Sequence, residues 1–511
     1  MTATLQIGII VAYLFIALGV GLVAYRVTER TAEDFYLASR TFGTVVLLFT
    51  VFATLLSAFT FFGGPDTAYA FGPEWILVMG LMDGVIFALL WYLVGYKQWL
   101  LGQRHGYLTL GEMLGDRFGS RGLRALVAGI SLFWLFPYIM LQQIGAGGAL
   151  ISLTDGAVPF WFGATLITVF MVIYVVLAGM RGIAWTDTLQ GAFMLVMVWA
   201  ALLWVLASVD GGISTINAGL ETDAPGFLAL GGEWYTPQRM LTFAISIAFG
   251  VAMFPQVNQR FFAAASETVL KRSFALWPIL VVLLFVPAFL LGTWARGLGL
   301  EADIAAGQSI LPVVLNEFAP GWFAALVIAG AVAAMMSSSD SMLLSGSSYF
   351  TRDIYRPIID SSISQNREDL LGRIGVAVFA FLALGASIWV EEIGAFGADT
   401  VGSLLVDIGD LAFGGFAQLA LPVLVALYWR QTTRQGIVTG LLVSQIGYLG
   451  FNLLPEVTIG GVSLFRATYF GWGISIYCML LGLLLTIGVS YLTVQSPEED
   501  SELYFDGLSA D

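Results

Sequence analysis

The chain has 511 residues, of which 58% are hydrophobic and only 11% are charged. Because soluble globular domains carry roughly 25% charged residues, this composition excludes a soluble globular protein and makes lipid the expected solvent. The net charge is −14. We expect a prokaryotic protein whose acidic excess reflects life in high salt.

About 13 apolar runs are long enough to cross a bilayer core of about 30 Å. Their approximate cores, in chain order, are 5–25, 44–62, 76–95, 126–150, 159–177, 187–207, 240–254, 274–294, 322–346, 374–390, 401–429, 437–454 and 469–492. The first run is read as a span, not a signal peptide, because no basic residue precedes it. We therefore predict an all-α polytopic membrane protein with about 13 transmembrane helices. Residues 1–495 form one transmembrane domain, followed by an acidic cytoplasmic tail over 496–511.

The basic residues predict the orientation of these spans, because Lys and Arg gather in cytoplasmic loops. Of the 21 Lys and Arg residues, all except Arg239, Arg296 and Arg466 fall on one side when the N-terminus is placed outside. We expect a multi-pass protein of the cell membrane with an outside N-terminus and a cytoplasmic C-terminus.

The sequence gives little support to bound cofactors. Cys478 and His105 are the only residues of their kinds, so neither a disulfide framework nor a typical metal site can form. No phosphate-binding glycine loop or nucleic-acid motif is present. We expect no enzyme activity, no cofactor, no nucleic-acid partner and no obligate protein partner.

Two spans contain sequences that favour an interrupted helix. Span 2 runs into Gly63, Gly64 and Pro65, and the short span 7 runs through Gly250 to Pro255. Interrupted helices at corresponding positions are typical of transporters built from inverted repeats, in which free carbonyls hold an ion or solute. The two spans lie five apart, as a five-plus-five repeat requires. Gly and Pro are also common in ordinary transmembrane helices, which is the competing explanation.

Span 9 contains the sequence AVAAMMSSSDSMLLSGSS over residues 331–348. Helical spacing puts most of its hydroxyls on one face, and the members of this stripe are Ala334, Ser337, Ser338, Ser341, Ser345 and Ser348. Serine oxygens suit a hard cation such as sodium at a lower desolvation cost than a carboxylate. Small residues in a stripe also allow close helix packing, so both explanations stay open at this point.

Ionisable residues inside a membrane are expensive and are candidates for function. Four aspartates fall within the predicted spans, namely Asp83, Asp340, Asp407 and Asp410. Each could instead form a structural hydrogen bond between helices. Asp340 is the strongest candidate for a role near an ion, because it lies one turn beyond Ser337.

Five segments together resemble the sodium:solute symporter family. They are DFYLASRTFG (34–43), FATLLSAFTFFGGP (52–65), AGMRGIAWTDTLQG (178–191), PQVNQRFFAAASE (255–267) and AAMMSSSDSMLLSGSSYFTRDIYRP (333–357). The resemblance implies a leucine-transporter-like fold. In that fold, spans 2–6 and 7–11 form the inverted repeats, here roughly residues 44–207 and 240–429.

The same resemblance implies a set of site residues. The sodium ligands of the family match Ala53, Leu56, Ala334, Ser337 and Ser338. The Trp185-Thr186-Asp187 signature implies a possible second cation site at Asp187, together with Ser57 of span 2.

The solute is expected to contact the two interrupted spans and span 3, through Leu55, Phe59, Thr60, Asp83 and Gly250. Leu55 replaces an acidic residue of proline carriers, and Phe59 and Thr60 replace carboxamides of sugar carriers. The segment FFGGPDTAYAFG (61–72) resembles pantothenate and monocarboxylate carriers. We therefore expect a small organic acid. An amino acid held through Asp83 is the alternative.

These observations predict a sodium-coupled symporter that imports a small organic solute by alternating access. Proton coupling through an intramembrane carboxylate is the nearest alternative. A channel would need a continuous polar pore, and a sensor would need a signalling domain.

Overall fold

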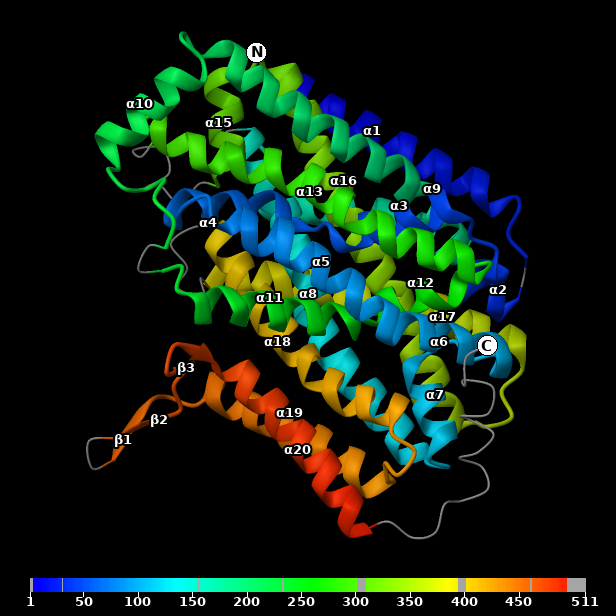
Figure 1. The fold of residues 1–511 in the computed structure, drawn as a ribbon. Helices are drawn as coiled ribbons and strands as arrows, with labels where there is room; N and C mark the ends of the chain where they lie inside the picture. The colour runs from blue at the N-terminus through cyan, green and yellow to red at the C-terminus, as the bar shows by residue number, and fades with distance from the viewer. Residues whose placement is uncertain are drawn as a thin grey trace.

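The computed structural model describes residues 3–29, 31–154, 156–231, 234–300, 309–393, 401–459 and 462–493. The predicted acidic tail, 496–511, lies outside these residues. The described chain is almost entirely helical (Figure 1), which confirms the all-α class. The helices of the first half are α1 (Ala3–Tyr25), α2 (Ala32–Leu37), η1 (Ala38–Arg40), α3 (Thr44–Leu55), η2 (Phe59–Gly63), α4 (Gly64–Phe71), η3 (Ile76–Met82), α5 (Asp83–Leu90), η4 (Trp91–Gly95), α6 (Tyr96–His105), α7 (Leu110–Arg117), α8 (Arg121–Leu153), α9 (Phe160–Ser208) and α10 (Ile213–Asp223).

The second half adds further helices and two short hairpins that the sequence did not predict. Its elements are α11 (Pro237–Ala252), α12 (Pro255–Ala263), α13 (Glu267–Gly297), α15 (Ile310–Phe318), α16 (Gly321–Ser348), η5 (Tyr349–Ile359), α17 (Gln365–Ile393), α18 (Val401–Tyr428), α19 (Arg434–Leu453), β1 (Val457–Ile459), β2 (Val462–Leu464), β3 (Thr468–Tyr469), β4 (Trp472–Gly473) and α20 (Ile474–Thr493). The strands pair β1 with β2 and β3 with β4, both antiparallel. Both hairpins lie between α19 and α20, at the edge of the molecule (Figure 1).

The expected count of 13 spans is not confirmed. The described residues contain 10 helices that are long and apolar enough to cross a membrane, or 12 if each of two bent pairs is one span. The predicted spans 159–177 and 187–207 correspond to the two parts of α9, which together have 49 residues and meet at a kink. Gly179 interrupts α9 with φ 55° and ψ −145°, and a Cβ there would come within 2.5 Å of the Phe35 carbonyl oxygen. Both the positive φ and the close contact require glycine at this bend.

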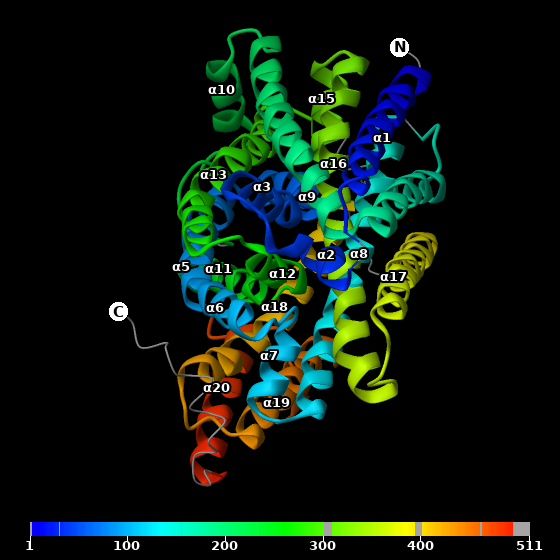
Figure 2. The same ribbon diagram turned by 90° about the vertical axis from the view of Figure 1, so that its right-hand side faces the viewer.

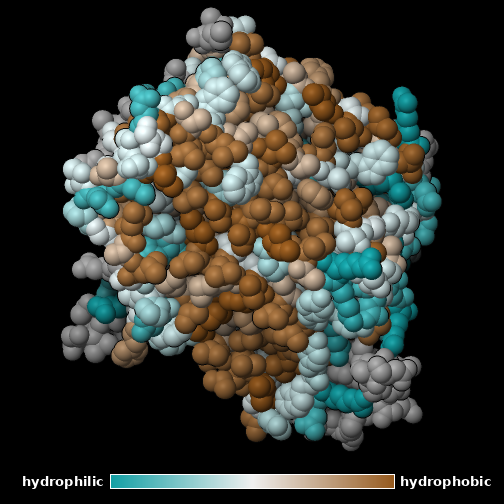
Figure 3. Space-filling model, turned by 45° about the horizontal axis from the view of Figure 1, so that its top comes forward, coloured by the Kyte–Doolittle hydropathy of each residue, from teal (hydrophilic) through white to brown (hydrophobic). Residues whose placement is uncertain are grey.

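The outer surface is suited to lipid. Large apolar side chains on five different helices are each more than half exposed, namely Phe15, Leu89, Phe133, Val196 and Leu382. Figure 3 shows a broad hydrophobic surface across the middle of one face, with hydrophilic residues gathered toward its left and right margins. An apolar belt of this extent between polar margins is typical of a membrane protein.

Helices α16 and α18 lie in the interior of the bundle, as Figure 2 also indicates for α16. The most apolar stretch of α16 and η5 is 83% buried and that of α18 is 72% buried, whereas the corresponding stretches of α1 and α17 are only 33% buried. The serine-rich sequence therefore belongs to a helix surrounded by protein. This position excludes contact of the serine stripe with lipid.

The two predicted interruptions are both present. Helix α3 is bent by 64° against the segment Phe59–Phe71, and α11 is bent by 54° against α12. At the second break Pro255 occupies the start of α12, where it lacks the N–H that a continuous helix would need. The breaks fall in spans 2 and 7, as the repeat pattern predicts.

An ion-pair network joins helix ends at the side that the basic loops predict to be cytoplasmic. Glu112 of α7 accepts hydrogen bonds from Arg124 at 2.8 Å and from Arg352 at 2.7 Å, and Arg352 also pairs with Glu368 of α17 at 2.8 Å. Burial raises the pKa of Glu112, but Arg352 and Arg124 outweigh it and hold that pKa below its usual value. The network fixes α7, α8, η5 and α17 to one another.

Candidate functional site

The backbone of α3 leaves the helical conformation in the interior of the protein. Leu56 is extended, with φ −86° and ψ 122°, so the last carbonyls of α3 have no partners within the helix. Polar atoms of α8 stabilise the break. The Ala58 N–H donates to Gln142 Oε1 at 2.9 Å, and Ser57 Oγ lies 3.1 Å from the Tyr138 hydroxyl. Because the helix ends at Leu55, the last carbonyl oxygens of α3 can accept hydrogen bonds from another helix.

Two serines of α16 supply those donors, and they bring together all five residues predicted as sodium ligands. The contacts are Ser337 Oγ with Ala53 O at 2.8 Å and Ala334 O at 3.0 Å, and Ser338 Oγ with Leu56 O at 2.8 Å and Thr54 O at 2.9 Å. Both serine side chains are fully buried. The arrangement concentrates neutral oxygens between a broken helix and a continuous one. Oxygen sets of this kind suit a hard monovalent cation.

Asp187 lies in a buried polar cluster beside this oxygen set. Its Oδ2 accepts hydrogen bonds from Thr50 at 2.5 Å and Thr54 at 3.5 Å, and forms an ion pair with Arg260 of α12 at 3.1 Å. Arg260 also donates to Ser341 of α16. Both Asp187 and Arg260 are fully buried. Because an unpaired charge would be costly here, each partner requires the other.

Arg260 was missed as a site residue by sequence reasoning. Span 7 was drawn only to residue 254, which placed Arg260 in a loop, whereas the structure places it in the buried helix α12. The run VNQRFFAAA contained a usable signal. An arginine inside an apolar sequence next to a predicted helix break is a candidate for a buried ion pair.

Two further predicted polar residues have separate partners. Asp340 accepts hydrogen bonds from the Tyr174 hydroxyl at 2.7 Å and from Ser341 Oγ at 3.0 Å, so it joins the cluster around Arg260. Ser57, expected beside Asp187, contacts Tyr138 instead. The structure therefore brings Asp340 to Asp187 through Ser341 and Arg260, but it does not bring Ser57 there.

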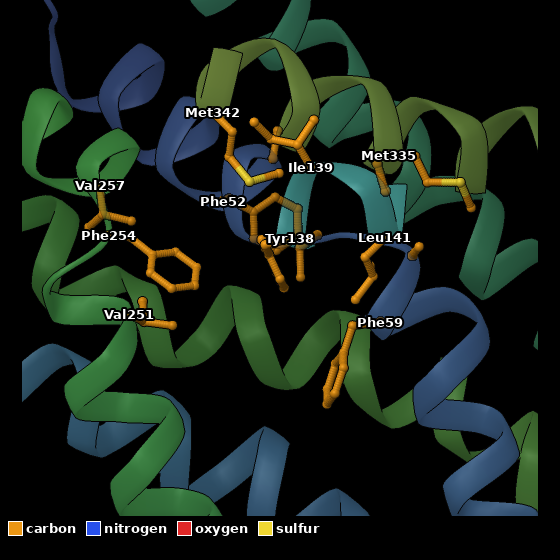
Figure 4. Close-up of a cluster of buried hydrophobic side chains, with 14 of the residues drawn as sticks. Phe52, Phe59, Tyr138, Ile139, Leu141, Val251, Phe254, Val257, Met335 and Met342 are labelled. Carbon is orange, nitrogen blue, oxygen red and sulfur yellow. The ribbon is translucent and has the colours of Figure 1, made fainter. Parts of the chain in front are cut away.

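A largely apolar cavity lies directly beyond the break in α3. Four of the five predicted solute contacts line it, namely Leu55, Phe59, Thr60 and Asp83. Leu56 lines the same cavity while its carbonyl contacts Ser338. Figure 4 shows Phe59, Tyr138 and Val251, all cavity-lining residues, reaching the same central region from different helices. The cavity and the oxygen set thus share one residue of the broken helix.

Gly250 is not among the residues that line this cavity. A Cβ at Gly250 would lie 2.3 Å from the Phe413 carbonyl oxygen, so the glycine allows close contact between the backbones of α11 and α18. Its neighbour Val251 lines the cavity instead. Asp407 and Asp410 lie on α18, where Asp407 is exposed and Asp410 is half-buried, and neither of them lines the cavity.

Comparisons with known proteins identify the family of the chain. The model of the sodium:solute symporter family matches residues 35–444. The sodium/pantothenate symporter of Escherichia coli (strain K12) is 28% identical over 478 residues, which cover 90% of this chain and 96% of that protein. The sodium/proline symporter of Haemophilus influenzae is 28% identical over 452 residues, which cover 85% of each chain.

The fold is similar to that of a solved transporter. A structure of a Na+-coupled sialic acid symporter in a substrate-bound outward-open state superposes with a TM-score of 0.78. The match covers 97% of this chain and 99% of that one, at 21% sequence identity. This likeness supports the leucine-transporter-like fold.

Proposed function

The chain belongs to the sodium:solute symporter family, and on that premise we propose that it imports a small organic solute by sodium-driven alternating access. It is a multi-pass transporter, not an enzyme. The observation that carries the proposal is the meeting of Ser337 and Ser338 with the carbonyls at the break in α3. In the proposal, sodium occupies this oxygen set and joins α3 to α16.

The proposed coupling between sodium and solute depends on Leu56, which belongs both to the oxygen set and to the cavity wall. Sodium bound to the Leu56 carbonyl would fix the extended backbone that also forms one wall of the cavity. The solute then binds more tightly to the sodium-loaded protein, and by reciprocity sodium binds more tightly when solute is present. One sodium ion falling through 100 mV and a tenfold gradient releases about 2.3 and about 1.4 kcal/mol. Together these terms support several-hundredfold accumulation of a neutral solute.

A second cation at Asp187 remains part of the proposal. Its Oδ1 atom is buried and has no hydrogen-bond partner within the described residues, although Oδ2 is paired with Arg260. An anionic solute would cancel the electrical driving force of a single sodium ion. A second ion bound by Oδ1 would restore it, and a sodium dependence with a Hill coefficient above one would support this arrangement.

Two classes of solute are proposed. A small organic acid, such as a monocarboxylate or a pantothenate-like molecule, is supported by the relative that transports pantothenate. An amino acid is the second candidate, supported by the proline-transporting relative and by Asp83 in the cavity wall. Proton coupling in place of sodium is the mechanistic alternative.

Uptake into proteoliposomes tests this function. The purified protein is reconstituted, and either a sodium gradient or a proton gradient is imposed while labelled pantothenate, monocarboxylates, proline and glucose are offered in turn. We expect the sodium gradient alone to drive accumulation of one of the organic acids or amino acids. Accumulation driven only by the proton gradient would contradict sodium coupling.

A further inference from the structure

The apolar cavity beyond the break in α3, where we propose that the solute binds, has one ionisable side chain among its described lining residues, Asp83. The polar groups in its wall are otherwise the hydroxyls of Thr60 and Tyr138 and the indole N–H of Trp277, and no Lys, Arg or His is among the described residues that line it. The remaining walls are aliphatic or aromatic. Asp83 is therefore the lining residue whose charge can pair with a charged group of the solute.

Asp83 is buried in an unusual way. Its side chain is 1% exposed, and neither carboxylate oxygen has a hydrogen-bond partner within the described residues. Three other buried aspartates have a basic partner, namely Asp34 with Arg181, Asp187 with Arg260 and Asp353 with Arg124. A buried carboxylate without hydrogen bonds or an opposite charge is strongly destabilising. Both carboxylate oxygens of Asp83 are therefore hydrogen-bond acceptors that the described residues leave without a donor.

The helix changes type at Asp83. This residue follows the π-helical segment η3 and begins the regular helix α5. Single π-helical turns inside longer helices are frequent at functional sites, because the extra residue redirects a side chain. The ring of Phe87, one turn further along α5, stacks against Trp277 with centroids 6.0 Å apart, and both rings line the cavity. Aromatic faces near a carboxylate are favourable surroundings for an organic cation.

We propose that Asp83 binds a cationic nitrogen of the transported solute inside this aromatic cavity. This inference rests on the proposed symport function and chooses between its two solute classes. A solute with only a carboxylate would find no basic residue among the described residues of the cavity wall to balance its charge. A solute with an ammonium or methylated ammonium group on an apolar body satisfies the carboxylate, and an amino acid does so while remaining neutral overall.

Matched pairs of solutes test the proposal. Proteoliposomes with an imposed sodium gradient are offered valine against isovalerate and proline against cyclopentanecarboxylate, with pantothenate alongside. We expect the nitrogen-bearing member of a pair to be taken up with at least about tenfold higher kcat/KM, because a buried charge-assisted pair contributes more than about 1.4 kcal/mol. Asp83→Asn should remove this preference, and Asp83→Glu should restore part of it.

Sodium binding to the purified variants provides the folding control, because Asp83 is not one of the proposed sodium ligands. Asp83→Asn that still binds sodium but has lost the preference for the cationic nitrogen supports the proposal. If the wild type and Asp83→Asn take up pantothenate or a deaminated acid equally well under a sodium gradient, Asp83 does not bind a cationic nitrogen of the solute. Sodium symport itself would then still stand. If the sodium gradient drives no solute at all, the symport function itself fails.

Discussion

Ser337 and Ser338 of α16 contact the carbonyls at the break in α3. Ser337 and Ser338 could be predicted because a run of hydroxyls inside an apolar span has few explanations, and because the family motif aligns them with known ligands. Their contacts with Ala53 and Leu56 join residues more than 280 positions apart. No local pattern contains that information, so the family resemblance supplied it.

Gly250 shows the opposite case. The break in span 7 made it a plausible solute contact, but the requirement for glycine comes from the backbone of α18, which the sequence alone does not place beside it. Ser57 is similar, because its partner Tyr138 lies on another helix. The residue types at Gly250 and Ser57 indicated a structural or functional requirement at each position. They did not identify the neighbouring residue that imposes it.

Substitution at Gly250 distinguishes packing from solute binding. Gly250→Ala would push a methyl group against the Phe413 carbonyl oxygen, and we expect it to destabilise the protein by about 1–3 kcal/mol. Gly19→Ala is the matched control, because no atom lies within 4 Å of its new methyl group. Thermal unfolding of the purified proteins in detergent measures both. A Gly250→Ala protein that is as stable as the wild type but binds solute differently would favour the solute contact.

At the scale of elements, the two broken helices could be predicted and the helix that follows the second break could not. Pro255 marked the second break, at the start of α12. The first break falls at Leu56, ahead of Gly63, Gly64 and Pro65, which are helical. The apolar run ended before Arg260, so α12 was not expected inside the protein. The structure shows that α12 is held by one ion pair to α9 and by hydrogen bonds to α3 and α16. A buried charge needs a partner, and here the partner of Arg260 lies on another helix, α9.

A double-mutant cycle tests how strongly this pair holds α12. Asp187→Asn or Arg260→Gln alone leaves a buried charge without its partner, and we expect each to cost about 3–5 kcal/mol of stability. The double variant should lose less than the sum, with a coupling above about 1 kcal/mol.

The exposed pair of Glu267 and Lys271 provides the control for this cycle. Removing both of its charges should show no measurable coupling, since surface pairs are screened by solvent. Additive losses at Asp187 and Arg260, measured by the same denaturation experiments, would show that the buried pair does not fix α12.

For the whole molecule, composition alone predicted the class, and the alternation of basic loops predicted an orientation that stays a prediction. The predicted spans 159–177 and 187–207 lie on either side of the kink in α9. A span count from hydropathy assumes that each apolar run ends at a loop. Between these two runs, Gly179 instead turns the chain without a loop.

Sodium coupling in the whole molecule depends on an ion that joins the broken helix α3 to the continuous helix α16. Equilibrium binding of radioactive sodium to the purified protein tests it without knowledge of the solute. We expect saturable binding in the wild type and in the Ser345→Ala variant, because the one hydrogen bond of the Ser345 hydroxyl within the described residues goes to Met342 of its own helix. Combined Ser337→Ala and Ser338→Ala should weaken binding at least about tenfold. Equal sodium affinity in all three proteins would contradict a sodium site formed by Ser337 and Ser338 between α3 and α16.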